Sequence, residues 1–578
     1  MTKRDGLIMT RYRCEYERWL QNADEESVRL LKEIENDDRE IEYRFSKNLS
    51  FGTAGLRGVM MPGLYAMNAY TVGAATAGLA RYIRELGAEE RGVLIGCDSR
   101  LHSREYAERA ACVMVENGVK VYLFDELRPT PMVSYGVREL NCIAGINITA
   151  SHNPKEYNGY KVYYEDGAQI SPAQAQIIAS YIDRTDVFSV SAYPYEKALK
   201  EGKIVLLGRD FDEKYLARVM EEQVDREAVK RAKDLKIVYT PFHGAGYRLV
   251  PEVLRRIGVG QLYVVPEQEA PDGNFPTVRS PNPENPEGFA CGIALAKRIG
   301  ADLVIATDPD CDRVGVTAKN AAGEFETVSG NCMGALLLDY IMRAHKENGT
   351  TPPDPYAVKT IVTTDLALEV CRRYGVKLYE VLTGFKYIGE VMTGCQRKGK
   401  GSFILGYEES YGYLKGTYAR DKDGVVASML IAEMAAYYAS RSMTLIDARE
   451  ELMKTFGFFA EKTVSVQFSG VDAAEKMKKV MEKIRRDPPE TIGGVRVRRV
   501  GDYLDGHFTC KVTGNRKKTG LPLSDVLSFT LFDRCKVLVR PSGTEPKVKI
   551  YFLCRGKDAA QAQRKIAACE EDMRKYIR

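Results

Sequence analysis

Three aspartates occupy alternate positions of one short segment: Asp308, Asp310 and Asp312. The segment follows the apolar run Leu303-Val-Ile-Ala306, which is typical of a buried strand. Three carboxylates in a tight turn repel one another unless a cation lies between them, and carboxylate oxygens are ligands that Mg²⁺ prefers. The spacing therefore predicts a magnesium site, with a solvated acidic turn as the alternative. Arg313 ends the segment and would hold a phosphate oxygen beside the metal.

A serine stands at the end of another apolar run. Ser151 lies in Thr149-Ala-Ser-His-Asn-Pro154, directly after Ile148, and open α/β sheets bind ligands at the carboxyl ends of their strands. A serine there predicts a nucleophile or a phosphoryl carrier, with a plain loop as the alternative. A hydrolase pair with His152 does not fit, because neighbouring side chains of an extended segment point to opposite sides and the chain has no GxSxG elbow.

Three further segments carry groups that bind sugars or phosphates. Glu408 and Ser410, in the segment 406–412, would contact sugar hydroxyls unless the segment is a surface turn. Cations, hydroxyls and a glycine in Arg540-Pro-Ser-Gly-Thr-Glu-Pro-Lys547 predict an anion cradle, with a hairpin turn as the alternative. Arg57 follows the small residues of Phe51-Gly-Thr-Ala-Gly-Leu-Arg57 and would reach a phosphate.

Strands and helices must position these segments. Strand-like apolar runs recur in three successive stretches, at 93–97, 143–148, 237–240, 303–306, 359–362 and 403–405. Helical patterns between the runs predict mixed sheets covered by helices. After about Met443, long polar turns predict a different, α+β arrangement. The expected fold class is α/β, with three similar mixed-sheet domains and a C-terminal α+β domain around one central cleft.

We predict four domains, each carrying one of the segments above. Residues 1–205 hold a charged N-terminal extension and Ser151, and residues 206–325 hold the aspartates. Residues 326–445 hold the sugar-contacting segment, and residues 446–578 hold the anion cradle.

Composition excludes several classes of protein. The chain is 44% hydrophobic and 28% charged, and its net charge of +5 is too small to call for nucleic acid. Thirteen cysteines without CxxC pairs favour reduced thiols in the cytoplasm. The N-terminus lacks a secretory pattern, and the apolar run 427–439 is too short to span a bilayer. We expect a cytoplasmic enzyme with no membrane partner, and we make no prediction of its oligomeric state.

In combination and order, the segments resemble those of the α-D-phosphohexomutase superfamily. The resemblance runs from about Phe51 to the end of the chain. The charged extension and the FGTAGLRG segment look most like the long branch of the family, which includes phosphoglucomutases, phosphopentomutases and a glucose-1,6-bisphosphate synthase.

The resemblance implies a role for each matching residue. Ser151 is the serine that is phosphorylated, and one of its phosphoryl oxygens completes the Mg²⁺ site of Asp308, Asp310 and Asp312. The other catalytic residues are Arg57, His152, Lys161 and Lys422. Either lysine would be the acid/base. The substrate-binding residues are Arg313, Thr383, Gly384, Glu408, Ser410, Arg540, Ser542, Gly543, Thr544 and Lys547.

The implied activity interconverts glucose 1-phosphate and glucose 6-phosphate, with glucose 1,6-bisphosphate as activator and intermediate. Glucose is preferred because the sugar segment keeps the GxEES pattern of glucose-preferring members. Phosphomannomutase, phosphopentomutase and bisphosphate synthase activities stay open as alternatives. A haloacid dehalogenase-type enzyme, in which an aspartate carries the phosphoryl group, would leave the Ser151, Glu408 and Arg540 segments without a role. A non-catalytic sensor would be expected to have lost Ser151 or an aspartate, and all four are present.

Overall fold

The computed structural model describes residues 10–52, 55–468, 473–542 and 547–577. It divides into two compact units. The first comprises residues 1–317 and 416–432, and the second comprises residues 318–415 and 433–578. This division does not follow the four predicted domains, because residues 416–432 of the predicted domain 326–445 belong to the first unit. The predicted boundaries stay a prediction.

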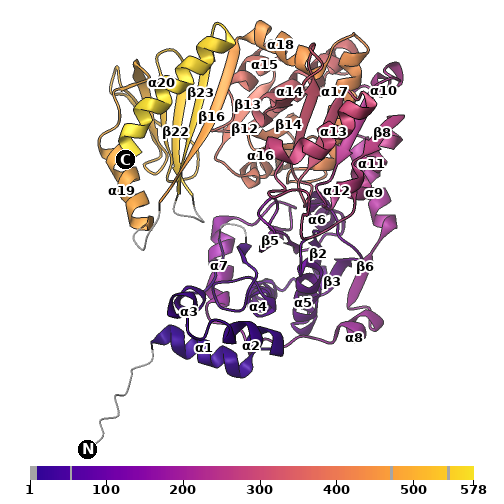
Figure 1. The fold of residues 1–578 in the computed structure, drawn as a ribbon, viewed down its shortest axis with the longest axis vertical. Helices are drawn as coiled ribbons and strands as arrows, with labels where there is room; N and C mark the ends of the chain where they lie inside the picture. Colours follow the sequence, from indigo (N-terminus) through magenta and orange to yellow (C-terminus); the bar gives the residue numbers. More distant parts are fainter. Residues whose placement is uncertain (1–9, 53–54, 469–472, 543–546, 578) are drawn as a thin grey trace, which may run out of the picture. The chain divides into compact units, whose positions relative to one another are not determined.

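Three short helices open the first unit: α1 (Arg11–Asn22), α2 (Glu25–Lys32) and α3 (Asp38–Phe45) (Figure 1). Aspartate side chains cap two of them, because Asp24 accepts from the Ser27 N–H and Asp37 from the Glu40 N–H. The helices enclose Trp19, which is fully buried and makes an edge contact with Phe45. Trp19 also makes edge contacts with Tyr70 of α4 and with Phe188, so the charged N-terminal extension packs onto the rest of the first unit through this cluster.

The first sheet has six strands in the order β1-β5-β4-β2-β3-β6. They are β1 (Gly55–Val59), β2 (Val93–Cys97), β3 (Val121–Phe124), β4 (Ala144–Ile148), β5 (Tyr157–Tyr164) and β6 (Ile204–Leu207). Strand β2 is parallel to β3 and β4, whereas β5 is antiparallel to β1 and β4. The accompanying helices are α4 (Ala69–Glu85), α5 (Ser103–Glu116), α6 (Thr130–Glu139), α7 (Pro172–Ile182) and α8 (Tyr195–Lys200).

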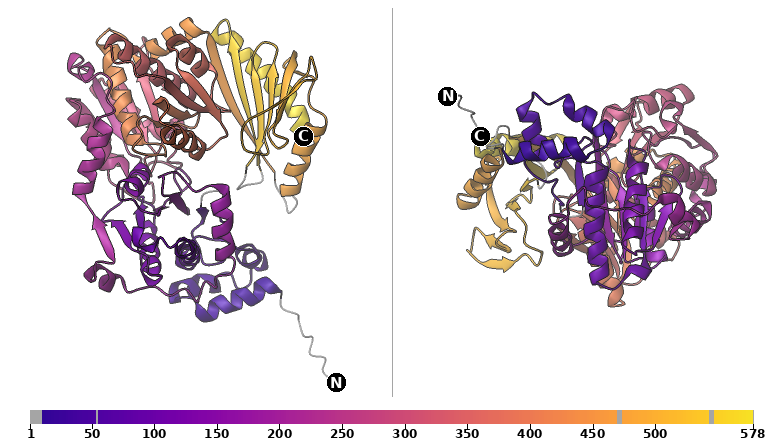
Figure 2. Two further views of the ribbon diagram at one scale, coloured as in Figure 1. Left: turned by 180° about the vertical axis from the view of Figure 1, so that it is seen from behind. Right: turned by 90° about the horizontal axis from the view of Figure 1, so that it is seen from below.

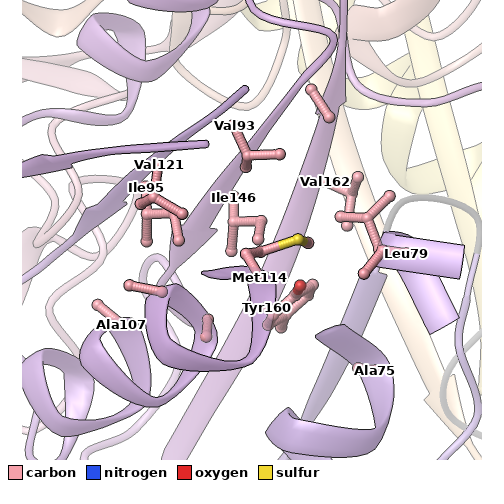
Figure 3. Close-up of a cluster of buried hydrophobic side chains, with 14 of the residues drawn as sticks. Ala75, Leu79, Val93, Ile95, Ala107, Met114, Val121, Ile146, Tyr160 and Val162 are labelled. Carbon is pink, nitrogen blue, oxygen red and sulfur yellow. The ribbon is translucent and has the colours of Figure 1, made fainter. Parts of the chain in front are cut away.

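Apolar side chains fix this sheet against its helices. Figure 3 shows Val93, Ile95 and Ile146 of the strands facing Met114 of α5, with Leu79 of α4 beside them. Burying each such side chain stabilises the fold by about 1.5–3 kcal/mol. The sheet therefore gives a rigid base to the loop that follows β4, which carries Ser151.

A second sheet has five strands in the order β11-β10-β9-β7-β8. They are β7 (Lys236–Thr240), β8 (Gln261–Val264), β9 (Leu303–Thr307), β10 (Val314–Lys319) and β11 (Phe325–Val328). Strand β7 is parallel to β8 and β9. The helices of this region are α9 (Arg209–Met220), α10 (Ala228–Arg231), α11 (Gly246–Arg256), α12 (Pro266–Glu269) and α13 (Ala290–Ile299). The three aspartates lie in the loop between β9 and β10.

The second unit contains a four-stranded sheet in the order β13-β12-β14-β15. Its strands are β12 (Pro355–Thr360), β13 (Lys377–Val381), β14 (Ser402–Glu408) and β15 (Gly412–Leu414). Its helices are α14 (Gly330–Glu347), α15 (Leu366–Tyr374), α16 (Phe385–Arg397) and α18 (Leu445–Phe456).

The same unit ends in an antiparallel sheet in the order β16-β23-β22-β21-β18-β19-β20, with β17 paired to β18. Its strands are β16 (Phe458–Gln467), β17 (Thr491–Ile492), β18 (Val495–Asp502), β19 (His507–Cys510), β20 (Arg516–Lys518), β21 (Leu527–Leu531), β22 (Lys536–Pro541) and β23 (Lys547–Gly556). Figures 1 and 2 show helix α20 (Ala559–Ile577) lying along this sheet, with α19 (Ala473–Arg486) nearby.

Three α/β sheets followed by a C-terminal α+β sheet confirm the predicted fold class. The central cleft stays a prediction. In the described part of the chain, no helix has the length and apolarity to cross a bilayer, including the apolar helix α17 (Gly424–Ala439). All thirteen cysteines are free thiols.

Candidate active site

Ser151 is buried in the loop that follows β4. Its hydroxyl donates a 2.8 Å hydrogen bond to Oδ2 of Asp308 and lies 3.2 Å from Nδ1 of His152. The expectation that these neighbouring side chains point to opposite sides was wrong, because Ser151 has a φ of 54° and the segment is not extended at this residue. Its backbone N–H donates to the Thr149 hydroxyl at 2.8 Å. The serine and an aspartate of the predicted metal site, 157 positions apart in the chain, are thus in direct contact.

The serine loop is held by a residue that sequence reasoning missed. The buried Arg100 guanidinium donates to the carbonyl oxygens of Ser151 at 2.6 Å, Pro154 at 2.8 Å and Tyr157 at 3.0 Å, and also to that of Asn153. Asp98 forms an ion pair with it at 3.4 Å. The planar fork of Arg presents several N–H donors at fixed angles, which suits a loop with several inward carbonyl groups.

The three aspartates lie together in the loop after β9. Suitable ligand atoms of Asp308, Asp310 and Asp312 all lie within 4.8 Å of one another, and the three side chains are buried. Oδ1 of Asp310 and Oδ1 of Asp312 have no hydrogen-bond partner among the described residues. Buried carboxylate oxygens without donors are costly unless a cation binds them, so this donor set fits Mg²⁺.

Burial and mutual repulsion separate the pKa values of these aspartates. Burial, together with the charges of Asp310 and Asp312, raises the pKa of Asp308 well above its usual range. Burial also opposes the charge of Asp312, but Lys161 and Lys422 outweigh it and lower the pKa of Asp312. The cluster therefore does not hold three full negative charges without a further cation.

Two lysines converge on the aspartates. Nζ of Lys161, on β5, lies 2.7 Å from Asp310 and 3.2 Å from Asp312. Nζ of Lys422 lies 3.3 Å from Asp312 and 3.1 Å from Asp421. Burial opposes the charge of Lys161, but Asp310 and Asp312 outweigh it, so its pKa is raised. In this arrangement Lys161 is a cation.

The other three polar residues expected in this unit lie around the serine loop. Arg57 donates to the Asn153 side chain at 3.2 Å. Arg313 forms a 2.5 Å ion pair with Glu284, a partner that the sequence did not indicate. Burial, followed by the charges of Arg313 and Arg57, lowers the pKa of His152 well below its usual range. His152 is therefore neutral near pH 7.

The second unit brings the two sugar-contacting segments together. The Gly384 N–H, at the start of α16, donates to Oε1 of Glu408 at 2.9 Å. The Thr383 hydroxyl is buried without a hydrogen-bond partner among the described residues, so it is available to a ligand. Ser410 lies two positions beyond the end of β14 and is partly exposed.

The predicted anion cradle follows β22 of the same unit. Arg540 belongs to that strand, and the Ser542 N–H donates to the Lys547 carbonyl oxygen at 2.8 Å where β23 begins. All three are partly exposed. Gly543 and Thr544 lie outside the described residues, so their predicted phosphate contacts stay a prediction.

Four family models match the chain in the order in which the segments occur. They describe the phosphoglucomutase/phosphomannomutase α/β/α domains I, II and III and the C-terminal domain, at residues 48–187, 213–323, 329–456 and 512–568. The chain belongs to the phosphoglucomutase/phosphomannomutase family. It is a phosphosugar mutase, which confirms the resemblance noted from the motifs.

Curated relatives of this family match nearly the whole chain. A phosphoglucomutase of Staphylococcus saprophyticus is 33% identical over 537 residues, which cover 92% of this chain and 95% of the relative. A phosphoglucomutase of Staphylococcus aureus is 34% identical over 554 residues, covering 96% and 98%. The solved structure of Paramecium parafusin, a phosphoglucomutase, has a TM-score of 0.66 at 18% identity, covers 92% of this chain and 94% of that protein, and shows the shared fold.

In this mutase, contacts in the first unit gather seven residues that the sequence predicted: Arg57, Ser151, His152, Lys161, Asp308, Asp310 and Asp312. Lys422 joins them through Asp312. Supporting residues were missed. Arg100 ends the segment Cys97-Asp-Ser-Arg100 after a buried strand, and Thr130 lies at the start of a helix. The signal that could have found Arg100 was the charged and hydroxyl segment Asp98-Ser-Arg100 at the carboxyl end of a buried strand.

Proposed function

We propose that this phosphosugar mutase interconverts glucose 1-phosphate and glucose 6-phosphate. Ser151 would carry the phosphoryl group, and glucose 1,6-bisphosphate would be the intermediate and activator. The observation that carries the proposal is the 2.8 Å hydrogen bond from the Ser151 hydroxyl to Asp308 within the buried aspartate cluster. The choice of glucose is supported by curated relatives named phosphoglucomutase at 33–34% identity.

Magnesium is the proposed cofactor. Asp308, Asp310 and Asp312 would hold it together with an oxygen of phosphorylated Ser151. When bound, Mg²⁺ would offset the negative charge of the transferring phosphoryl group.

The remaining steps fall to the side chains of the chain. Lys161 and Lys422, both within 3.3 Å of Asp312, bring positive charge to the place where the phosphoryl group is attached. One of them would take the proton of the attacking sugar hydroxyl. A lysine can do so only after losing its own proton, which the raised pKa of Lys161 opposes. The group that takes the proton must be deprotonated, so its pKa sets the limb of the pH–rate profile on which activity rises with pH; the profiles of Lys161→Ala and Lys422→Ala would show which lysine sets that limb.

Substrate groups away from the reaction would be held by the second unit. We propose that Thr383, Gly384, Glu408 and Ser410 contact sugar hydroxyls. The phosphate that is not transferred would be bound by Arg540, Ser542, Gly543, Thr544 and Lys547. On the first unit, Arg57 and Arg313 would contact the phosphoryl group, and Arg313 would exchange its Glu284 partner for a phosphate oxygen.

A coupled mutase assay tests the proposal. It compares glucose 1-phosphate, mannose 1-phosphate and ribose 1-phosphate with Mg²⁺ and catalytic glucose 1,6-bisphosphate. We expect the highest kcat/KM for glucose 1-phosphate and loss of turnover in Ser151→Ala, because no other group replaces the phosphoryl carrier. Preference for mannose or ribose would shift the assignment to a phosphomannomutase or phosphopentomutase. No turnover of any of the three sugars would refute the mutase proposal and favour a bisphosphate synthase.

We also propose that the enzyme works in the cytoplasm, because its thirteen free cysteines suit a reducing compartment. Its proposed partners are sugar phosphates alone.

A further inference from the structure

Thr130, the first residue of α6, contacts the metal-site residue Asp310 twice. Its backbone N–H donates to the Asp310 carbonyl oxygen at 2.8 Å, and its hydroxyl lies 2.8 Å from Oδ2 of the carboxylate. Lys161 donates to the same Oδ2 at 2.7 Å. Two donors therefore occupy Oδ2, whereas Oδ1 of Asp310 has no hydrogen-bond partner within the described ranges.

The buried Asn147 of β4 fixes the direction of the Thr130 hydrogen bond. Its Nδ2 lies 2.7 Å from the Thr130 hydroxyl oxygen. A carboxylate can only accept a hydrogen bond, so the hydroxyl proton of Thr130 must point at Asp310. The lone pairs of the hydroxyl then accept from Asn147. The hydrogen bonds therefore run in one direction, from the Asn147 amide to the Thr130 hydroxyl and from that hydroxyl to the Asp310 carboxylate.

We propose that Thr130, oriented by Asn147, is a positioning residue that presents Oδ1 of Asp310, and not Oδ2, to the magnesium ion. The inference rests on the magnesium site proposed above. The terminal torsion of an aspartate is broad and roughly two-fold, so an unrestrained carboxylate exchanges its two oxygens easily. With Oδ2 held by Thr130 and Lys161, the open oxygen is defined before the ion arrives. Outer-shell contacts of this kind change metal affinity by about 10–100-fold.

The test removes only the hydroxyl of Thr130. Thr130→Val has the same shape and keeps the backbone N–H that binds the Asp310 carbonyl. We expect it to weaken Mg²⁺ binding about 10–100-fold in titration calorimetry of the full-length protein, and Thr130→Ser to restore affinity to within about threefold. At saturating Mg²⁺, the kcat of Thr130→Val should return to within about threefold of wild type, because the side chain does not touch the substrate in this proposal.

Thr76→Val is the matched control. Thr76 is also fully buried, and its hydroxyl bonds to the Val72 carbonyl oxygen at 2.8 Å and to the Tyr160 hydroxyl at 3.1 Å. It contacts no aspartate of the cluster, so its loss should leave Mg²⁺ affinity unchanged. An equal loss of affinity in Thr76→Val would show that destabilisation alone accounts for the effect and would overturn the proposal.

A folded Thr130→Val with wild-type Mg²⁺ affinity would also overturn the proposal. If Thr130→Val does not fold, Mg²⁺ binding by Asn147→Leu, measured by titration calorimetry, tests the proposal instead. That variant frees the Thr130 hydroxyl to rotate and should weaken Mg²⁺ binding at least threefold, whereas unchanged affinity would refute the role of the pair. Absence of Mg²⁺ binding in wild type would refute the magnesium site itself, which separates its failure from that of the positioning pair.

Discussion

Three loops that carry predicted site residues, two in the first unit and one in the second, each contain a non-glycine residue with a left-handed backbone. The φ angles are 54° at Ser151, 54° at Cys311 and 66° at Tyr411. This conformation costs a non-glycine residue about 1–2 kcal/mol and persists only where surrounding contacts determine it. At Ser151 those contacts come from the Thr149 hydroxyl and the Arg100 guanidinium. The strain therefore lies where a serine hydroxyl must be aimed at an aspartate.

Arg100→Lys should disorder the serine loop while keeping the charge beside Asp98. A lysine ammonium cannot reproduce the fork of N–H donors that binds the carbonyl groups of Ser151, Pro154 and Tyr157. The buried carbonyl oxygen of Ser151 and the partly buried ones of Pro154 and Tyr157 would lose their partners, so we expect the free energy of unfolding to fall by about 2–4 kcal/mol. Phosphorylation of Ser151 by glucose 1,6-bisphosphate, measured by intact-protein mass spectrometry, should slow at least tenfold.

Arg91→Lys is the control for this substitution. Arg91 also donates to backbone carbonyl groups, but its side chain is 41% exposed and its partners Asn141, Cys142 and Glu165 lie outside the serine loop. Its replacement should change the free energy of unfolding by less than about 0.5 kcal/mol. Equal effects of the two substitutions, or unchanged Ser151 phosphorylation in Arg100→Lys, would contradict a clamping role for Arg100.

Residues that react were easier to predict than residues that support them. Asp308, Asp310 and Asp312 are recognisable by their spacing, because three carboxylates at alternate positions after an apolar strand are typical of a loop that binds a hard cation. Arg100 and Thr130 look like ordinary residues in the sequence. Their roles depend on which carbonyl or carboxylate the fold brings near, and that pairing spans 180 positions for Thr130 and Asp310.

At the scale of elements, three separate segments hold the loop of the aspartates. The Thr130 N–H, at the start of α6, donates to the Asp310 carbonyl oxygen at 2.8 Å. The Ala245 N–H, in the loop between β7 and α11, donates to the Pro309 carbonyl oxygen at 2.7 Å. The Gly424 N–H, at the start of α17, donates to the Cys311 carbonyl oxygen at 3.0 Å. The loop is thus fixed along its backbone as well as through its side chains.

Gly244→Ala should displace the aspartate loop. A Cβ at this position would lie 2.4 Å from the Pro309 Cα, which is a backbone atom and cannot rotate away. We expect a loss of about 1–3 kcal/mol in the free energy of unfolding, typical of overpacking, together with weaker Mg²⁺ binding in titration calorimetry. Gly260→Ala, in the same sheet region but with open space around its Cβ, should change neither quantity. Wild-type Mg²⁺ affinity in a folded Gly244→Ala would contradict the inference that close packing at Gly244 holds the aspartate loop in place.

The sheets were predictable to the extent that their strands are apolar and buried. The expected strands at 93–97 and 143–148 lie within one residue of β2 and β4, because these strands are buried on both faces. The expected strand at 359–362 overlaps only the end of β12 (Pro355–Thr360), since the strand begins at a proline and its apolar residues are interrupted by a lysine. The pairing of Gly384 with Glu408 could not be predicted, because it depends on how α16 and β14 pack.

At the scale of the whole molecule, the second unit joins two sheets through one apolar cluster. Ile361 and Leu382 from the four-stranded sheet region pack with Tyr503, Leu538 and Tyr551 from the C-terminal sheet. The sequence did not predict this contact between the two sheets, because the residues that form it are scattered over nearly 200 positions. Because these side chains bury one another across the junction, we expect the two sheets of this unit to unfold in a single thermal transition.

An ion cluster built on the buried Lys359 crosses the same junction; its partners Asp365, Glu380 and Lys536 are partly exposed. Nζ of Lys359 lies 2.7 Å from Glu380 and 3.3 Å from Asp365, and Nζ of Lys536 on β22 lies 2.8 Å from Asp365. Burial opposes the charge of Asp365, but the two lysines outweigh it and lower its pKa to about 2. An aspartate whose folded-state pKa is lowered stabilises the fold above its unfolded-state pKa near 4, and this contribution is lost as the pH falls towards 2.

Asp365→Asn should therefore lower the free energy of unfolding at neutral pH. It should also make that free energy fall less steeply as the pH decreases. With a pKa about two units below the unfolded value, the carboxylate contributes about 2–3 kcal/mol at pH 7, and the variant should lose that amount. Urea unfolding between about pH 5 and pH 2.5 should show a smaller decline for Asp365→Asn than for wild type, because the variant has no carboxylate to protonate there. Asp354→Asn, at an exposed aspartate of the same unit, is the control and should follow the wild-type curve. Parallel curves for wild type and Asp365→Asn would mean that the lysines do not hold Asp365 ionised.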